Sequence, residues 1–248
     1  MIGQVRAEWI KWRSLRSSFA LLTTILLLSG IFATIAALTF HSNDTAKALD
    51  VVDGNPIFVS MFLGLIGALL ICSEYSQGTL TPTFLSTPRR IQVLASKVLF
   101  GVVLALGIAL VAQLFAFLVG SLLLARDGVS IALSDPGVIR QLAESTLFAA
   151  CGVMFGLAIG VVLRQTVAAV VICITWPILI ESLLGASLPK NLQSYLPFNA
   201  LRALLSSVQG PDGSGYALSP LGGVAVYFAW IAILMVVGAW FMNRADAK

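Results

Sequence analysis

The distribution of charged residues constrains the fold of this chain more than any other feature of its sequence. Charges are absent from six long stretches, at 17–43, 54–73, 98–125, 145–163, 165–180 and 213–243. A helix needs about 20 mainly apolar residues to cross the roughly 30 Å hydrocarbon core of a bilayer. Five of the stretches reach that length or nearly so. The stretch at 165–180 reaches it only if the helix continues past Glu181 to Gly185.

Composition indicates the same class of protein. Only 10% of the residues are charged and the mean hydropathy is +0.97, whereas soluble domains carry about 25% charged residues. We therefore predict an all-α membrane protein in which residues 1–248 form one domain with six transmembrane helices. The expected spans are about 19–40, 56–73, 98–124, 144–163, 166–185 and 220–242.

Lysine and arginine divide unevenly between the two sides of this arrangement. With the N-terminus inside, ten of the 15 fall on the cytoplasmic side: Arg6, Lys11, Arg13, Arg16, Arg89, Arg90, Lys97, Arg164, Arg244 and Lys248. Lys47, Arg126, Arg140, Lys190 and Arg202 fall outside. Positive residues favour the cytoplasmic side, which predicts a multi-pass protein with both termini in the cytoplasm. The net charge of +4 then follows from topology and requires no nucleic-acid partner.

Residues 1–18 precede the first span and alternate apolar and basic positions. An apolar seam at helical spacing is formed by Ile2, Val5, Trp9 and Trp12, while Arg6, Lys11 and Arg13 lie largely off it. Tryptophan beside basic residues suits the headgroup region. We predict an amphipathic helix lying in the interface; a cytoplasmic extension of the first span is the alternative.

The segment 74–97 is the longest polar stretch between two apolar runs that also combines turn residues with positive charge. Thr81-Pro82 and Thr87-Pro88 each read as an N-cap followed by proline in the first turn. This pattern predicts a short helix, a break, and a long helix beginning near Pro88. A solvated loop is the alternative reading.

The sequence provides no catalytic site of a familiar kind. A phosphate-binding loop needs Gly-Lys-Ser/Thr, and none of the five lysines follows a glycine. The single histidine, His41, lies at the outer edge of a predicted span among scattered aspartates, so we expect no metal site. Cys72, Cys151 and Cys173 fall within predicted spans and lack metal-ligand spacing. We expect them to be buried as small apolar side chains.

Candidates for a substrate pathway are few. Glu144 and Glu181 lie 20 and 17 residues from Arg164, about 30 and 25 Å along a helix. Both are therefore expected near the outer interface, either as ordinary interface residues or along an exit path. Further lining candidates are Phe58, Met61 and Phe62 on the second span and Thr175 and Trp176 on the fifth. Core packing would explain these five residues equally well.

Three glycines recur at four-residue spacing in the fourth span. They are Gly152, Gly156 and Gly160. A glycine face allows close approach of another helix in a membrane. The partner could be a helix of the same chain or a second subunit.

Together these features resemble the permease subunits of type-2 ATP-binding-cassette transporters. The resemblance rests on six spans, the basic amphipathic N-terminus, and Glu74-x3-Gly78-Thr79 followed by Pro88-Arg89-Arg90 and Lys97. It implies that the segment after the second span contains a short cytoplasmic coupling helix that docks on a separate ATPase. Glu74, Gly78 and Thr79 would match the motif that shapes this helix. Pro88, Arg89, Arg90 and Lys97 would match the basic start of the third span.

The resemblance also implies partners. Two cassette ATPase subunits and a second permease, identical or homologous, would complete the transporter, with ATP and magnesium bound by the ATPase and no cofactor in this chain. The expected function is export of an amphipathic or hydrophobic substrate, and the expected location is a bacterial plasma membrane. An ATP-independent secondary transporter or channel, or a membrane anchor or assembly factor, remains the alternative.

Overall fold

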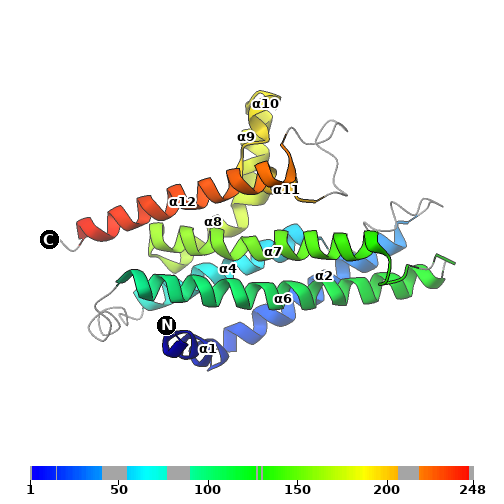
Figure 1. The fold of residues 1–248 in the computed structure, drawn as a ribbon, viewed down its shortest axis with the longest axis horizontal. Coiled ribbons are helices and arrows are strands. Elements are labelled where there is room, and N and C mark those ends of the chain that lie inside the picture. The colour runs from blue at the N-terminus through cyan, green and yellow to red at the C-terminus, as the bar shows by residue number, and fades with distance from the viewer. Residues whose placement is uncertain are drawn as a thin grey trace.

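The structure is a computed structural model that describes residues 2–14, 16–40, 55–76, 90–126, 128–129, 131–205 and 218–245 (Figure 1). Every regular element in these ranges is helical. The helices are α1 (Ile2–Ser14), α2 (Arg16–Leu38), α4 (Pro56–Ser76), α6 (Arg90–Arg126), α7 (Pro136–Leu163), α8 (Thr166–Thr175), η1 (Trp176–Ile180), α9 (Glu181–Ser187), α10 (Lys190–Gln193), α11 (Pro197–Arg202) and α12 (Pro220–Ala245). In Figure 1 the marked chain ends and the start of α6 lie at the same end of the bundle.

Six helical stretches are long and apolar enough to cross a membrane. They are Ser18–Leu38, Pro56–Ser76, Ala95–Arg126, Pro136–Leu163, Thr166–Ser187 and Pro220–Gly238. The fifth consists of α8, η1 and α9 together. The prediction of an all-α membrane protein with six spanning helices is confirmed.

Several helices extend beyond the stretches predicted to span the membrane, α6 and α7 by the most residues. α6 begins at Arg90, eight residues before its predicted span at 98–124, and the helix itself is predicted to begin near Pro88. α7 begins at Pro136, eight residues before its predicted span at 144–163. Asp135 has an extended backbone and Pro136 stands in the first turn of α7, where proline loses no intrahelical hydrogen bond. A helix ends at its capping and turn residues, whereas charge-free runs mark only its hydrocarbon part.

α4 and α7 form the centre of the bundle. The apolar windows of α4 and α7 are 67% and 72% buried, against 22–33% in the other four spans. One apolar cluster joins them to α2 and α6 through residues such as Ile25 and Phe100. A second cluster joins them to α8, α11 and α12 through residues such as Phe198 and Tyr227.

The three glycines of α7 bring its backbone into direct contact with α4. A Cβ atom added at Gly156 would overlap the backbone carbonyl of Gly64. Gly152 approaches the carbonyl of Ser60 in the same way. At Gly160 the added atom would lie 3.2 Å from the nearest carbonyl oxygen of α4. These glycines therefore pack within the chain, with van der Waals contact between backbones as the stabilising interaction.

α1 is a separate helix at the end of the bundle where the chain begins (Figure 1). Val5 and Trp12 pack against the first apolar cluster. The Trp9 ring stacks on that of Trp12, with 5.8 Å between centroids, and meets Phe100 edge-on. The described part of the predicted seam thus faces α2 and α6, with Trp9 half exposed.

The fifth span changes its helix type at Trp176. α8 ends at Thr175 and the next five residues form the π-helical turn η1 before α9 begins at Glu181. Pro177 has no N–H to donate to the carbonyl four residues earlier, so the α-helical hydrogen bonds cannot continue unbroken.

Replacing Gly156 by alanine should lower the free energy of unfolding by about 1–3 kcal/mol, because the added methyl group pushes α7 away from α4. Gly185→Ala in α9 is the matched control, since a Cβ atom there meets no described atom within 4 Å. Both variants gain similar helix propensity, so only packing differs. The measurement is equilibrium unfolding of the purified protein in detergent. Equal stability of the two variants would contradict the close packing of α4 and α7.

Candidate functional site

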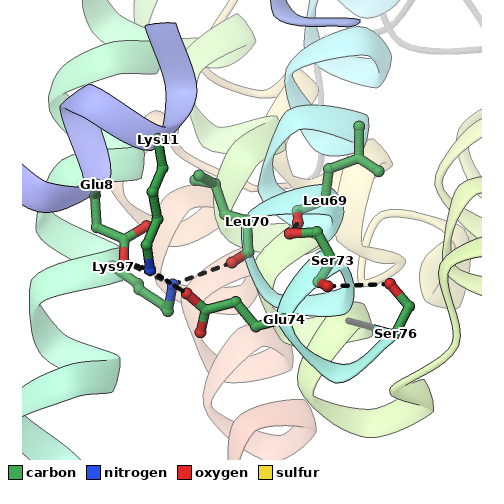
Figure 2. Close-up of polar contacts among 8 residues, drawn as sticks. All are labelled: Glu8, Lys11, Leu69, Leu70, Ser73, Glu74, Ser76 and Lys97. Atoms are coloured by element: carbon green, nitrogen blue, oxygen red, sulfur yellow. Dashed lines mark hydrogen bonds and ion pairs between the residues drawn. The ribbon is translucent and has the colours of Figure 1, made fainter. Parts of the chain in front are cut away.

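Four charged side chains from three helices meet in one place (Figure 2), at the end of the bundle where α1 lies (Figure 1). Glu8 and Lys11 come from α1, Glu74 from α4 and Lys97 from α6. Lys97 Nζ lies 2.9 Å from Glu8 Oε1 and 2.8 Å from Glu74 Oε1. Lys11 Nζ lies 2.8 Å from Glu74 Oε1 and 3.5 Å from Glu8 Oε1. We call these four residues the charge cluster.

The ammonium group of Lys97 has a partner for each of its three donors. In addition to the two carboxylates, it donates a hydrogen bond of 3.2 Å to the backbone carbonyl of Leu70. The side chain is only 4% exposed, and an unpaired ammonium at such a depth would cost many kcal/mol. Complete pairing is therefore the condition under which lysine can be buried at this position.

Glu74 connects the two lysines through one oxygen atom. Its Oε1 receives both ammonium groups at 2.8 Å. Its Oε2 is buried and has no hydrogen-bond partner within the described ranges. Because Glu74 lies in the last turn of α4, this carboxylate fixes the end of α4 to both α1 and α6.

The charge cluster is electrically neutral, with each ammonium group between two carboxylates. Partial burial lowers the pKa of Lys11, but the hydrogen bonds and charges of Glu74 and Glu8 outweigh it and hold that pKa above its ordinary value of 10.5. Because the folded-state pKa is raised, the contribution of Lys11 to stability is present below pH 10.5 and is lost only at higher pH. Its contacts are therefore retained at neutral pH.

The charge cluster bridges the two helices that flank residues 77–89. α4 ends at Ser76 and α6 begins at Arg90. A displacement that separates these helix ends must break the contact between Glu74 and Lys97. A displacement that keeps the contact must move both helices together, and α1 with them.

The residues predicted to couple to an ATPase are only partly described. Glu74 and Lys97 are in direct contact, and Arg90 is the first residue of α6. Gly78, Thr79, Pro88 and Arg89 lie outside the described residues.

Glu8 and Lys11 were not among the predicted site residues. The spacing of the N-terminal helix contains the signal, because position 8 lies three residues after Val5 and four before Trp12, on the apolar seam. A single carboxylate on the packed face of a basic helix needs a buried cation as its partner. The sequence alone does not say which lysine provides it.

The turn between α7 and α8 also approaches this end of α4. Arg164 ends α7 in the left-handed conformation, with φ of 54°. Its guanidinium carbon lies 5.6 Å from the ring centroid of Tyr75, a cation–π distance. Tyr75 follows Glu74, so the ends of α4 and α7 are joined beside the charge cluster.

The pathway candidates on the second span pack inside the chain. Phe58 stacks on Phe32 of α2, with 4.5 Å between ring centroids. Met61 is buried, and Phe62 packs against both apolar clusters. Their positions are those of core residues between α4 and its neighbours.

The pathway candidates on the fifth span take part in local hydrogen bonds. The Thr175 hydroxyl donates to the carbonyl of Val171 at 2.8 Å. Trp176 Nε1 donates to Glu181 Oε1 at 3.2 Å. Glu181 is 3% exposed, so its side chain is buried within the protein.

Glu181 caps the N-terminus of α11. Its two oxygens accept the backbone N–H groups of Phe198 and Asn199 at 2.7 and 2.9 Å. Leu196, the residue before the helix, has no polar side chain for this purpose. Glu181, the first residue of α9, therefore supplies the hydrogen-bond acceptors and the negative charge that stabilise the start of α11.

Glu144 has a different environment from Glu181. It accepts a hydrogen bond of 2.7 Å from Arg140 Nε, one turn earlier in α7. The Arg140 side chain is 67% exposed, so this pair lies at the surface of the bundle.

The described residues include no group of three or more histidine, cysteine, aspartate or glutamate side chains that could hold a metal ion. Cys72 and Cys173 are buried and Cys151 is partly buried; all three are free thiols.

Comparison with protein families places the chain among transporters. The family described as ABC-2 family transporter protein matches residues 4–180, or 177 of the 248 residues. The chain belongs to the ABC-2 transporter family. A search of curated proteins finds no match.

Membership in the ABC-2 family makes this chain a membrane transport component of the permease type. Permeases of the ABC-2 family generally work with an ATPase partner and are not themselves enzymes. The matched range contains all four residues of the charge cluster.

Lys97→Met should lower the free energy of unfolding by about 3–5 kcal/mol, because it leaves buried carboxylates without their central cation. Arg140→Met is the control at an exposed ion pair and should cost at most about 1 kcal/mol. Both values come from equilibrium unfolding in detergent. Equal losses of unfolding free energy in the two variants would show that the buried ion pairs of Lys97 stabilise the protein no more than an exposed pair does.

Glu181→Ala should destabilise the protein by about 1–3 kcal/mol for each backbone N–H that loses its acceptor. Glu181→Gln keeps an acceptor oxygen and should lose less. The same unfolding measurement compares the two variants. If glutamine is as damaging as alanine, capping of α11 is not the role of this side chain.

Proposed function

We propose that this chain is the permease subunit of an ATP-binding-cassette exporter, driven by a separate ATPase that docks on the cytoplasmic segment 74–97. Two ATPase subunits and a second permease, identical or homologous, would form the working transporter. ATP and magnesium would be bound by the ATPase. The substrate would be amphipathic or hydrophobic.

The observation that carries this proposal is the contact between Glu74 and Lys97. These residues flank the segment expected to dock, and they join the helices on either side of it. A force applied to the segment therefore acts on α4 and α6 together. Glu8 and Lys11 extend the connection to α1.

The distribution of charge supports a cytoplasmic position for this segment. Ten of the 15 lysine and arginine residues belong to the side that includes the N-terminus and the 74–97 segment. The positive-inside rule assigns that side to the cytoplasm, where a soluble ATPase could reach it.

Motion would pass into the membrane through α4. Closure of the ATPase dimer would displace the ends of α4 and α6, and the glycine contact would carry α7 along with α4. Packed interfaces respond to such displacements by rigid-body movement, not by continuous deformation. The spans would then alternate between inward and outward openings.

The composition of the spans supports the proposed substrate class. The stretches 98–125 and 213–243 contain no charged residue. The carboxylate of the buried Glu181 already accepts hydrogen bonds from the N-terminus of α11. An ion passing through such spans would lack the polar groups that replace its water. A hydrophobic or amphipathic molecule would need few such polar groups.

Charge reversal at Arg89 and Arg90 tests the docking segment. The double variant Arg89→Glu/Arg90→Glu should weaken assembly with the cassette ATPase by about tenfold or more, because like charges at an interface cost several kcal/mol. Arg126→Glu, at the opposite end of α6, is the control and should assemble normally. Co-purification and the rate of ATP hydrolysis in proteoliposomes measure the two effects.

Membrane insertion of the double variant should be unchanged. Normal assembly and normal stimulation of ATP hydrolysis by this variant would rule out docking at 74–97. Substrate transport by the wild-type chain without any ATPase would instead identify a secondary transporter or channel.

A further inference from the structure

An apolar groove of about 1060 Å³ lies between α1, α2 and α6. Its walls include Trp12 of α1, Leu22 and Leu26 of α2, and Phe100 of α6. Among the described side chains that line it, Arg6 is the charged one. α1, α2 and α6, which form its walls, lie on the side of the bundle opposite α12 (Figure 1).

The length of the groove matches one leaflet of a bilayer. On α6 it follows a stripe at four-residue spacing that runs from Leu99 through Val103 and Gly107 to Val111. Twelve residues of helix span about 18 Å, and half of the hydrocarbon core is about 15 Å. Val103 and Val111 are more than half exposed. The stripe therefore offers an unfilled apolar surface as long as an acyl chain in a single leaflet.

The end of the groove next to α1 has the character of a headgroup site. Trp9 and Trp12 line this end, and tryptophan favours the boundary between hydrocarbon and headgroups. The exposed Arg6 lies one turn before Trp9. Glu8 points instead into the charge cluster, where it pairs with Lys97. The charge presented beside the groove is therefore positive.

We propose that this groove binds an anionic phospholipid of the leaflet next to α1, with the acyl chains along α6 and the headgroup phosphate at Arg6. Guanidinium groups bind phosphate through paired hydrogen bonds, and basic residues near a membrane surface favour anionic lipids. Because α1 forms a wall of the groove and also carries Glu8 and Lys11, the bound lipid stabilises the helix that completes the charge cluster. The site does not depend on the presence of an ATPase.

Lipid binding by the full-length purified chain tests the proposal. Native mass spectrometry would count dioleoylphosphatidylglycerol and dioleoylphosphatidylcholine retained from a mixture of equal composition. The wild type should retain phosphatidylglycerol preferentially. Arg6→Gln should reduce this binding about fivefold, the effect expected for one basic residue near an anionic headgroup. Arg13→Gln, on the same helix but outside the groove, should leave binding unchanged.

A second pair of variants tests the acyl-chain part of the site. Val103→Trp should fill the groove and abolish retention of phosphatidylglycerol, whereas Val236→Trp, at a similarly exposed valine of α12, should not. Thermal unfolding should show the same pattern, with phosphatidylglycerol stabilising only the proteins whose groove is open.

Three results would overturn the proposal. One is equal retention of the two lipids by the wild type, and another is equal retention of phosphatidylglycerol by Arg6→Gln and Arg13→Gln. The third is efficient disulfide cross-linking between Val103→Cys chains in native membranes, because a second copy of the chain would then cover the groove.

Discussion

The buried ammonium group of Lys97 sets the arrangement of the helices at one end of this protein. It lies below the surface, and it is stable there only because two carboxylates and a backbone carbonyl occupy all three of its donors. Those acceptors belong to α1 and α4, while the lysine belongs to α6. A buried charge with partners on three elements fixes the distances between them more strictly than apolar contacts do, since apolar side chains can repack.

Deeper in the bundle, the relative position of α4 and α7 is set by glycines, which allow the two backbones to touch. Gly152 and Gly156 leave the backbones of α7 and α4 in contact, with no side-chain atoms that could adjust between them. The two interactions are continuous through α4, whose last turn holds Glu74. Movement of residues 74–97 would consequently be transmitted to α1, α6 and α7 through their contacts with α4, although no loop joins α4 to all three of these helices.

The sequence predicted the spanning helices, because these depend on the difference between water and hydrocarbon as surroundings for a charge. Six charge-free runs identified six spanning helices because the cost of a charge in hydrocarbon is large and does not depend on tertiary contacts. The family resemblance singled out Glu74 and Lys97, which lie in contact. Helix bounds were harder to predict from charge-free runs. α7 begins at Pro136, eight residues before the predicted span, because a helix can continue beyond its charge-free part.

The remaining features depend on contacts between residues distant in sequence. Glu181 was expected near the outer interface, but the acceptors it provides to α11 become visible only once Phe198 is known to lie beside it. Glu8 likewise pairs with a lysine 89 positions later. The sequence predicted an amphipathic helix in the interface, but it did not identify the partner of this carboxylate. Such pairings require the fold before they can be assigned.

A double-mutant cycle between Glu8 and Lys97 tests most directly whether buried charge fastens α1 to α6. Free energies of unfolding would be measured in detergent for the wild type, Glu8→Gln, Lys97→Met and the double variant. Residues in one ion-pair network typically couple by about 0.5–3 kcal/mol, and a value at the upper end of that range is expected here. Additive losses, with a coupling energy near zero, would contradict the central role of this contact.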